Sequence, residues 1–362
     1  MSARPAVAVV VPCFGVGERV LPVLAGIGPE VSRIYVVDDA CPLRTGEIVR
    51  RENHDPRVSV LVHAENQGVG GAMVSGYQAA LVGGAEIVVK VDGDGQMDPA
   101  LIGAFVAPLA AHDADYVKGN RFYDLGFLGG MPRVRLAGNA LLSLVNKFSS
   151  GYWNVMDPTN GYTAIHRSAL ASLPLDKLDR CYFFESDILF RLYTIRAVVV
   201  DLPMRARYGD EKSNLSVFRV LREFPGKYLA RAVKRVFYAY FLRDFNAGSL
   251  QLVLGLVTTG GGALYGALRW AASSASGVPA TSGEVMLAAL PLLIGVQLLL
   301  GALNFDVQNL PRDPLSRYAP LSASGPDPAA DGFRPGPGQP NSRDGEVEPA
   351  SVSPPPPAGS AR

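Results

Sequence analysis

The feature that most constrains the fold is a series of short apolar runs, rich in β-branched residues, that each end in polar or glycine-rich turns. Stretches with helical spacing follow the first and the third of these runs, at residues 18–27 and 73–81. Strands that alternate with helices in this way favour an α/β domain with a doubly wound, mostly parallel sheet. The runs lie at residues 6–11, 34–37, 58–62, 86–91, 114–121, 163–165 and 198–203.

The fourth run leads into an acidic loop. Asp92, Asp94 and Asp98 follow it, and Pro99 ends the loop. Sheets of this class bind ligands beyond the carboxyl ends of their strands. Only Gly93 separates Asp92 from Asp94, so a tight turn can bring both carboxylates onto one Mg2+ or Mn2+ ion. A polar turn or a helix cap is the alternative interpretation.

Composition and charge exclude several classes of protein. With 362 residues, of which 48% are hydrophobic, the chain can bury the core of one large domain with additions. A net charge of +1 argues against a nucleic-acid-binding protein. Cys13, Cys41 and Cys181 form no C-x-x-C pair, so the sequence indicates neither a disulfide framework nor a zinc site and favours a reducing compartment.

A glycine-rich turn follows the third run. Gly68, Gly70 and Gly71 lack the G-x-G-x-x-G spacing, and the run before them is not the first, so we reject a dinucleotide site. Tight helix packing is an equally good reason for glycine at these positions.

The second half of the chain has a membrane pattern. Residues 250–268 and 285–305 contain no charge, and each stretch is long enough to cross about 30 Å of hydrocarbon. Residues 217–241 place apolar side chains at three- and four-residue steps with arginine and lysine between them. This pattern predicts two basic amphipathic helices, broken at Pro225-Gly226, on an anionic bilayer surface. Buried core helices and an ordinary surface helix are the alternatives.

The charge distribution also predicts an orientation and a domain plan. By the positive-inside rule the large N-terminal domain lies on the cytoplasmic face of a multi-pass membrane protein, and the loop at residues 269–284 is external. From Pro311 onward the chain is dense in Pro, Gly and Ser, which predicts disorder. We expect an α/β domain at residues 1–214, juxtamembrane helices at 215–246, transmembrane helices near 250–270 and 285–305 within 247–307, and a disordered tail at 308–362.

Several of these segments together resemble the family 2 glycosyltransferases with a Rossmann-like GT-A fold. They are Val9 to Pro12, Val37-Asp38-Asp39, Asn66-Gln67-Gly68, Asp92 to Gln96 and Glu185-Ser186-Asp187. The stretch from Tyr208 to Ser213, the amphipathic segment and the apolar hairpin resemble the polyprenyl-phosphate branch. The resemblance implies inverting, metal-dependent transfer of a hexose from a UDP- or GDP-sugar to polyprenyl phosphate.

The resemblance also implies roles for individual residues. Asp92 and Asp94 would hold the metal with Gln96, and Asp157 would face the acceptor. Asp187 matches the general base of relatives with hydroxyl acceptors, and with a phosphate acceptor it would only orient the site. The expected donor-binding residues are Pro12, Asp38, Asp39, Asn66, Gly70 and Asp92. The expected cations for the acceptor phosphate are Arg121, Arg205, Arg207 and Lys212.

Two other functions stay open at this point. One is a glycosyltransferase of the same fold that acts on a saccharide or glycolipid hydroxyl. The other is a non-catalytic membrane scaffold that binds sugar nucleotides, against which the intact acids argue. The sequence also leaves open whether the chain forms a homo-oligomer.

Overall fold

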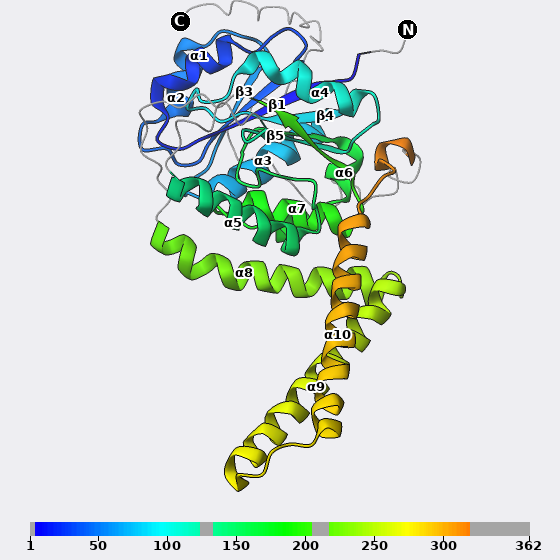
Figure 1. Ribbon diagram of the computed structural model, residues 1–362. Helices are drawn as coiled ribbons and strands as arrows, with labels where there is room; N and C mark the ends of the chain where they lie inside the picture. Colours follow the sequence, from blue (N-terminus) through cyan, green and yellow to red (C-terminus); the bar gives the residue numbers. More distant parts are fainter. Residues whose placement is uncertain (1–3, 124–132, 205–216, 319–362) are drawn as a thin grey trace, which may run out of the picture. The chain divides into compact units, whose positions relative to one another are not determined.

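The computed structural model describes residues 4–123, 133–204 and 217–318 (Figure 1). It confirms a mostly parallel sheet of seven strands, in the order β3-β2-β1-β4-β6-β5-β7. Only β6, among these strands, runs antiparallel to its neighbours β4 and β5. The strands are β1 Val7–Cys13, β2 Arg33–Asp38, β3 Val58–Val62, β4 Ile87–Lys90, β5 Tyr116–Asn120, β6 Thr163–His166 and β7 Val199–Pro203.

Helices cover both faces of this sheet. The helices of the sheet domain are α1 Val20–Ala25, α2 Thr45–Glu52, α3 Gly68–Val82, α4 Ile102–Ala110, α5 Arg133–Ser150, α6 Arg167–Ser172 and α7 Phe184–Thr194. Because successive side chains of a strand point to opposite faces, alternate strand residues pack in two different cores. In β1, Ala8 and Val10 pack in a core that includes residues of α3 and α7, whereas Val9 and Val11 pack in a core that includes residues of α1 and α4.

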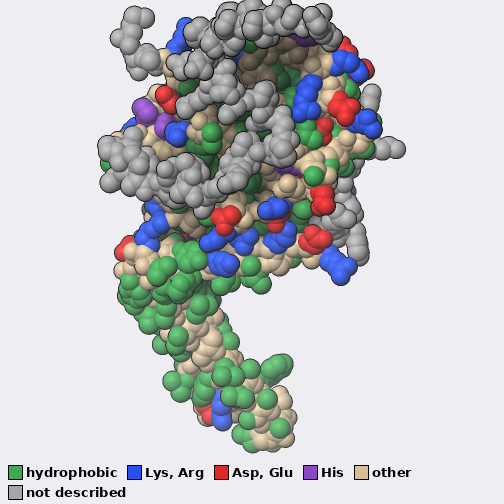
Figure 2. All heavy atoms as spheres, turned by 180° about the vertical axis from the view of Figure 1, so that it is seen from behind, with side chains coloured by type: hydrophobic (Ala, Val, Ile, Leu, Met, Phe, Trp, Pro, Cys, Tyr) green, Lys and Arg blue, Asp and Glu red, His purple; other side chains and the backbone are tan. Residues whose placement is uncertain are grey.

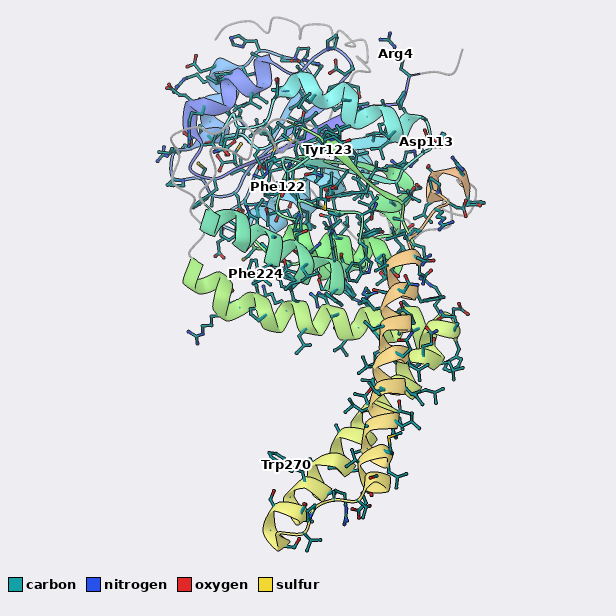
Figure 3. The ribbon with its side chains drawn as sticks, in the orientation of Figure 1. Arg4, Asp113, Phe122, Tyr123, Phe224 and Trp270 are labelled. Carbon is teal, nitrogen blue, oxygen red and sulfur yellow. The ribbon has the colours of Figure 1, made fainter. Side chains whose placement is uncertain are left out.

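The predicted break at Pro225-Gly226 is wrong. One helix, α8 (Val217–Phe237), continues through Pro225, and a turn of π-helix at Tyr238–Leu242 follows it. Aromatic packing holds the helix on both sides of the proline, since the rings of Phe224 and Tyr228 both contact the Phe183 ring, with centroids 5.3 and 4.9 Å apart. Figure 3 shows Phe224 on the side of α8 that faces the sheet domain. This tertiary packing outweighs the local preference of proline to end a helix.

Two long helices, α9 (Ala247–Ser276) and α10 (Ser282–Gln308), form the hairpin. Capping boxes begin both helices, at Asn246 with Ser249 and at Thr281 with Glu284, and Gly277 ends α9 in a left-handed conformation. By length and composition both helices can cross a membrane, and their most apolar windows are only 22% and 11% buried, unlike core helices. Figure 2 shows hydrophobic side chains over most of the hairpin surface.

The segment after α10 corrects another prediction. We expected disorder from Pro311, but Leu315–Tyr318 forms a 3-10 turn on the sheet domain. The buried carboxylate of Asp115 accepts hydrogen bonds from the backbone N–H groups of Leu315 and Ser316 at 2.9 and 3.1 Å. Polar backbone groups are therefore satisfied there by a side chain from a distant part of the sequence. The rest of the predicted tail lies outside the described residues.

Candidate active site

The acidic loop lies at the carboxyl end of β4. The Asp92 side chain is 31% exposed, and its Oδ1 pairs with the Lys90 ammonium at 2.9 Å. Asp94 accepts a hydrogen bond from the Gln96 backbone N–H at 3.0 Å. Burial and the neighbouring Asp92 charge raise the pKa of Asp94 above its ordinary value. The loop therefore keeps both carboxylates partly open to solvent, with the Asp92 charge close enough to act on Asp94.

Lys90 is a buried cation that the sequence reasoning missed. Its ammonium lies 2.9 Å from the Asp92 carboxylate and 3.4 Å from the carboxylate of Glu185, which belongs to the first turn of α7. Burial lowers the pKa of Lys90, but the two carboxylates outweigh it and the net pKa is raised. A Cβ on Gly161 would collide with the Lys90 ammonium and Asp92 Oδ2. The segments around Asp92, Gly161 and Glu185 therefore all pack next to the Lys90 ammonium.

The two acids at the end of β2 bind backbone amides. Asp38 accepts hydrogen bonds from the N–H groups of Cys41 at 2.7 Å and Gly46 at 2.6 Å. Asp39 accepts from the N–H groups of Gln67 and Gly68, both at 2.8 Å, and its Oδ1 lies 2.7 Å from His63 Nδ1. Both acids are buried and hold the loops that follow β2 and β3 in place.

The other expected donor-binding residues lie along the same edge. Pro12 pairs with Val37 in the β1–β2 register. The Asn66 side chain accepts a hydrogen bond from the Gly68 N–H at 2.9 Å. The N–H of Gly70 donates to the Arg180 carbonyl at 2.8 Å, and a Cβ there would collide with the Asp179 carbonyl. The packing requirement expected for these glycines is thus present at Gly70.

Asp157 and Arg121 are brought together as an ion pair. The Asp157 carboxylate is fully buried, and its two oxygens accept from Arg121 Nε at 2.7 Å and Nη2 at 3.0 Å. The Arg121 side chain is 26% exposed. Two parallel hydrogen bonds of this kind fix the plane of a guanidinium group. The structure therefore presents Arg121 in a set orientation at the carboxyl end of β5.

Asp187 lies in the first turn of α7, two positions after Glu185. It is fully buried in α7, where Oδ2 accepts from Arg191 Nε at 3.0 Å and from the Asp179 N–H at 2.9 Å. Oδ1 accepts from Arg231 Nε of α8 at 2.5 Å. Both oxygens of Asp187 thus bind guanidinium groups, and one of these groups comes from the predicted interfacial helix.

A second buried lysine, Lys118, lies on β5, between β6 and β7 in the sheet. Lys118 faces Thr163 across the β5–β6 register, as Lys90 does across β4–β6, and its ammonium donates to the Asn160 carbonyl. Burial lowers the pKa of Lys118 to about 8, and burial raises the pKa of Asp201 to about 6. Asp201 lies opposite Lys118 on β7 and accepts from the Met156 N–H at 2.8 Å. Sequence reasoning gave no role to either residue.

Three of the predicted cations, Arg205, Arg207 and Lys212, lie outside the described residues. Within the described ranges, no group of three or more His, Cys, Asp or Glu side chains forms a metal cage. Magnesium sites that are completed by substrate phosphates need only one or two carboxylates. Asp92 and Asp94, with hard oxygen donors in a partly exposed turn, fit such an ion.

A mostly parallel sheet with two carboxylates beyond its central strand β4 has the arrangement of a GT-A-like fold, with the ligand site at the carboxyl ends of the strands. The family model for glycosyl transferase family 2 matches residues 8–173. An undecaprenyl-phosphate mannosyltransferase of Micrococcus luteus is 31% identical over 175 residues, which are 48% of this chain and 71% of the relative. This chain belongs to glycosyl transferase family 2 and is a glycosyltransferase.

Other similar proteins include a polyprenol monophosphomannose synthase of Mycolicibacterium smegmatis, 29% identical over 54% of this chain and 75% of the relative. Among solved structures, glucosyl-3-phosphoglycerate synthase of Mycobacterium tuberculosis in complex with Mn2+, UDP and phosphoglyceric acid has a TM-score of 0.48 and 19% identity. That match covers 64% of this chain and 78% of the other.

Proposed function

We propose that this chain transfers a hexose from a UDP- or GDP-sugar to polyprenyl phosphate, with inversion at the anomeric carbon, at the cytoplasmic face of a membrane. The observation that carries the proposal is the meeting of the Asp92 loop with the Asp157–Gly161 segment at Lys90, in a chain that also has an apolar hairpin. Two relatives, an undecaprenyl-phosphate mannosyltransferase and a polyprenol monophosphomannose synthase, support the same class of acceptor.

The donor side would work through the acidic loop. Asp92 and Asp94 would hold Mg2+ or Mn2+, with Gln96 as a further ligand, and the bound ion would offset negative charge on the departing nucleoside diphosphate. Lys90 holds the Asp92 carboxylate at the end of β4 before any ligand arrives. Such preorganisation lowers the cost of arranging the site during the reaction.

The acceptor side would work through positive charge. A phosphate monoester has a second pKa of about 6, so near neutral pH it is largely ionised and needs positioning more than deprotonation. Asp157 holds the guanidinium of Arg121 in a fixed plane, which suits a phosphate oxygen. An acceptor oxygen would attack the anomeric carbon while the bond to the nucleoside diphosphate breaks, and the electron pair would leave with the diphosphate.

Asp187 bears on the choice of acceptor. A hydroxyl acceptor needs a base that the hydroxyl can reach. Asp187 is fully buried, and Arg191 and Arg231 bind its two oxygens. This arrangement favours a phosphate acceptor, with Asp187 as a residue that positions the helices around the site.

The membrane side would place the site at the height of lipid headgroups. On α8, Leu229, Val233 and Phe237 are more than half exposed, at four-residue steps along one side of the helix. Exposed apolar residues with basic neighbours are typical of a helix in the bilayer surface. Together with the hairpin, α8 would keep the catalytic domain next to an acceptor that stays in the membrane.

The test is sugar transfer in detergent from labelled UDP- and GDP-sugars to undecaprenyl phosphate, with Mg2+ or Mn2+ and with chelator. We expect a metal-dependent lipid product that Asp94→Ala reduces about a hundredfold or more. Asp98→Ala is the matched control, because Asp98 lies in the same loop and its side chain caps the Ala100 N–H.

Each contrary result selects another function. Metal-dependent donor hydrolysis without a lipid product would overturn the acceptor and direct attention to saccharide hydroxyls. No metal-dependent turnover with any donor would favour the non-catalytic scaffold.

A further inference from the structure

One buried carboxylate joins the apolar hairpin to the sheet domain. Asp306, in the last turn of α10, is 6% exposed and accepts four hydrogen bonds. Arg235 donates two of them, at 2.7 and 3.1 Å, Tyr240 O–H donates at 2.5 Å and Trp153 Nε1 donates at 2.8 Å. Charge-assisted hydrogen bonds to a buried acid are among the stronger ones in proteins.

The donors come from three different segments. Arg235 belongs to α8, Tyr240 to the π-helical turn after it, and Trp153 to the loop after α5. The remaining nitrogen of Arg235, Nε, donates to the Phe148 carbonyl at 3.1 Å. The Phe148 and Trp153 rings meet edge to face, with centroids 4.9 Å apart. Asp306 therefore binds the end of α10 to the interfacial helix and to the loop at once.

This loop leads directly into the acceptor side of the site. Asp157 follows Trp153 by four positions and holds Arg121. Between them, Asn154 Nδ2 donates to the Val199 carbonyl at 2.9 Å and the Met156 N–H donates to Asp201 at 2.8 Å. Both contacts fix the loop to β7. Asp157 therefore follows a segment held at one end by α10 and along its length by the sheet.

We propose that Asp306 is a positioning residue that sets the depth of the Trp153–Asp157 loop relative to the membrane. This inference rests on the proposed function, because it assumes an acceptor whose phosphate stays at the bilayer surface. Asp306 is the first charged residue after the apolar residues 285–305, so the length of that stretch sets its depth in a bilayer. Through Trp153 it then determines whether Arg121 meets the acceptor phosphate.

The first experiment measures depth without activity. The chain has two tryptophans, Trp153 and Trp270, and Figure 3 shows Trp270 near the far end of the hairpin. In a Trp270→Phe background, Trp153 is the only indole, and lipids brominated at different acyl positions quench it according to its depth. We expect Asp306→Asn to change this quenching profile. The matched control is Gln308→Ala, two positions away, which removes only the exposed hydrogen bond to Asn304.

The second experiment separates positioning from general stability. The full chain in nanodiscs is assayed with undecaprenyl phosphate and with a short, water-soluble prenyl phosphate that can approach at any depth. We expect Asp306→Asn to lower kcat/KM for the long acceptor about tenfold or more, since small misplacements of reacting groups have large effects, and to change the value for the short acceptor less than about twofold. Trp153→Phe, which keeps a ring but removes the N–H donor, should show the same pattern more weakly.

The results are decisive in either direction. An unchanged quenching profile in Asp306→Asn overturns the inference, as does an equal loss with both acceptors. If the wild type makes no lipid product but Asp306→Asn still moves Trp153, the proposed acceptor is wrong and the positioning role stands.

Discussion

The two sides of the site hold their acids by different means. On the side that we propose binds the donor, here called the donor side, Asp38 and Asp39 accept hydrogen bonds from backbone N–H groups at most 29 positions away. On the membrane side, Asp157, Asp187 and Asp306 each pair with an arginine 36 to 71 positions away. The first arrangement is local and organises loops. The second joins separate elements, so the membrane side depends on the packing of the whole chain.

This difference has an energetic meaning. A backbone amide that loses its acceptor costs about 1–3 kcal/mol when buried, whereas an unpaired buried charge costs about 3–5 kcal/mol. Variants of membrane-side acids should therefore lose stability together with activity. Variants of donor-side acids should lose less stability. The following predictions test this contrast, beginning with the largest expected change in stability.

Asp187→Asn should destabilise the protein by about 3–5 kcal/mol, because it leaves the partly buried Arg191 and Arg231 without their acid. Thermal unfolding in detergent measures the change. The double variant Asp187→Asn with Arg231→Gln should recover part of the loss, as expected for a coupled pair. A variant as stable as the wild type but nearly inactive would instead indicate a catalytic base and remove Asp187 from the comparison.

Asp38→Asn should cost about 1–3 kcal/mol, because the new amide group cannot accept from both Cys41 and Gly46. The measurement is again the midpoint of thermal unfolding, with Asp55→Asn as a control in the loop before β3, where the side chain is 26% exposed and the partner Arg57 lies two positions away. A loss as large as that of Asp187→Asn would show that backbone amides stabilise buried acids as strongly as arginine does. The comparison would then fail.

Asp201→Asn should have the smallest effect and the opposite sign. Burial raises the pKa of Asp201 from 3.8 to about 6, so between these values the folded protein binds a proton more tightly than the unfolded chain. The stability contributed by this group therefore falls as the pH rises through 6. We expect Asp201→Asn to raise Tm at pH 8 by about 2–4 °C and to flatten the dependence of Tm on pH between about 4 and 6. A lower Tm at pH 8 would contradict this sign.

The same contrast explains what the sequence could predict. The donor side follows local patterns, namely strands that end in acids and glycines that permit close approach, so Asp92, Asp94 and the sheet were visible as motifs. Lys90 was not singled out, because nothing near it in the sequence shows that it is buried and paired with Glu185. That contact depends on how α7 packs against the sheet. The pairs Asp187–Arg231 and Asp306–Arg235 depend on how α8 and α10 pack, which no local pattern encodes. For the same reason, the continuity of α8 through Pro225 became visible only in the structure.

The return of the chain to Asp115 has a consequence for biosynthesis. The buried Asp115 carboxylate binds the N–H groups of Val198, Leu315 and Ser316, and the last two lie 200 and 201 positions further along the chain. A ribosome therefore completes both apolar helices before the sheet domain can form these hydrogen bonds. These contacts within the catalytic domain can therefore form only after the hairpin has been synthesised. A truncated soluble form that ends before residue 315 would lack part of its own fold.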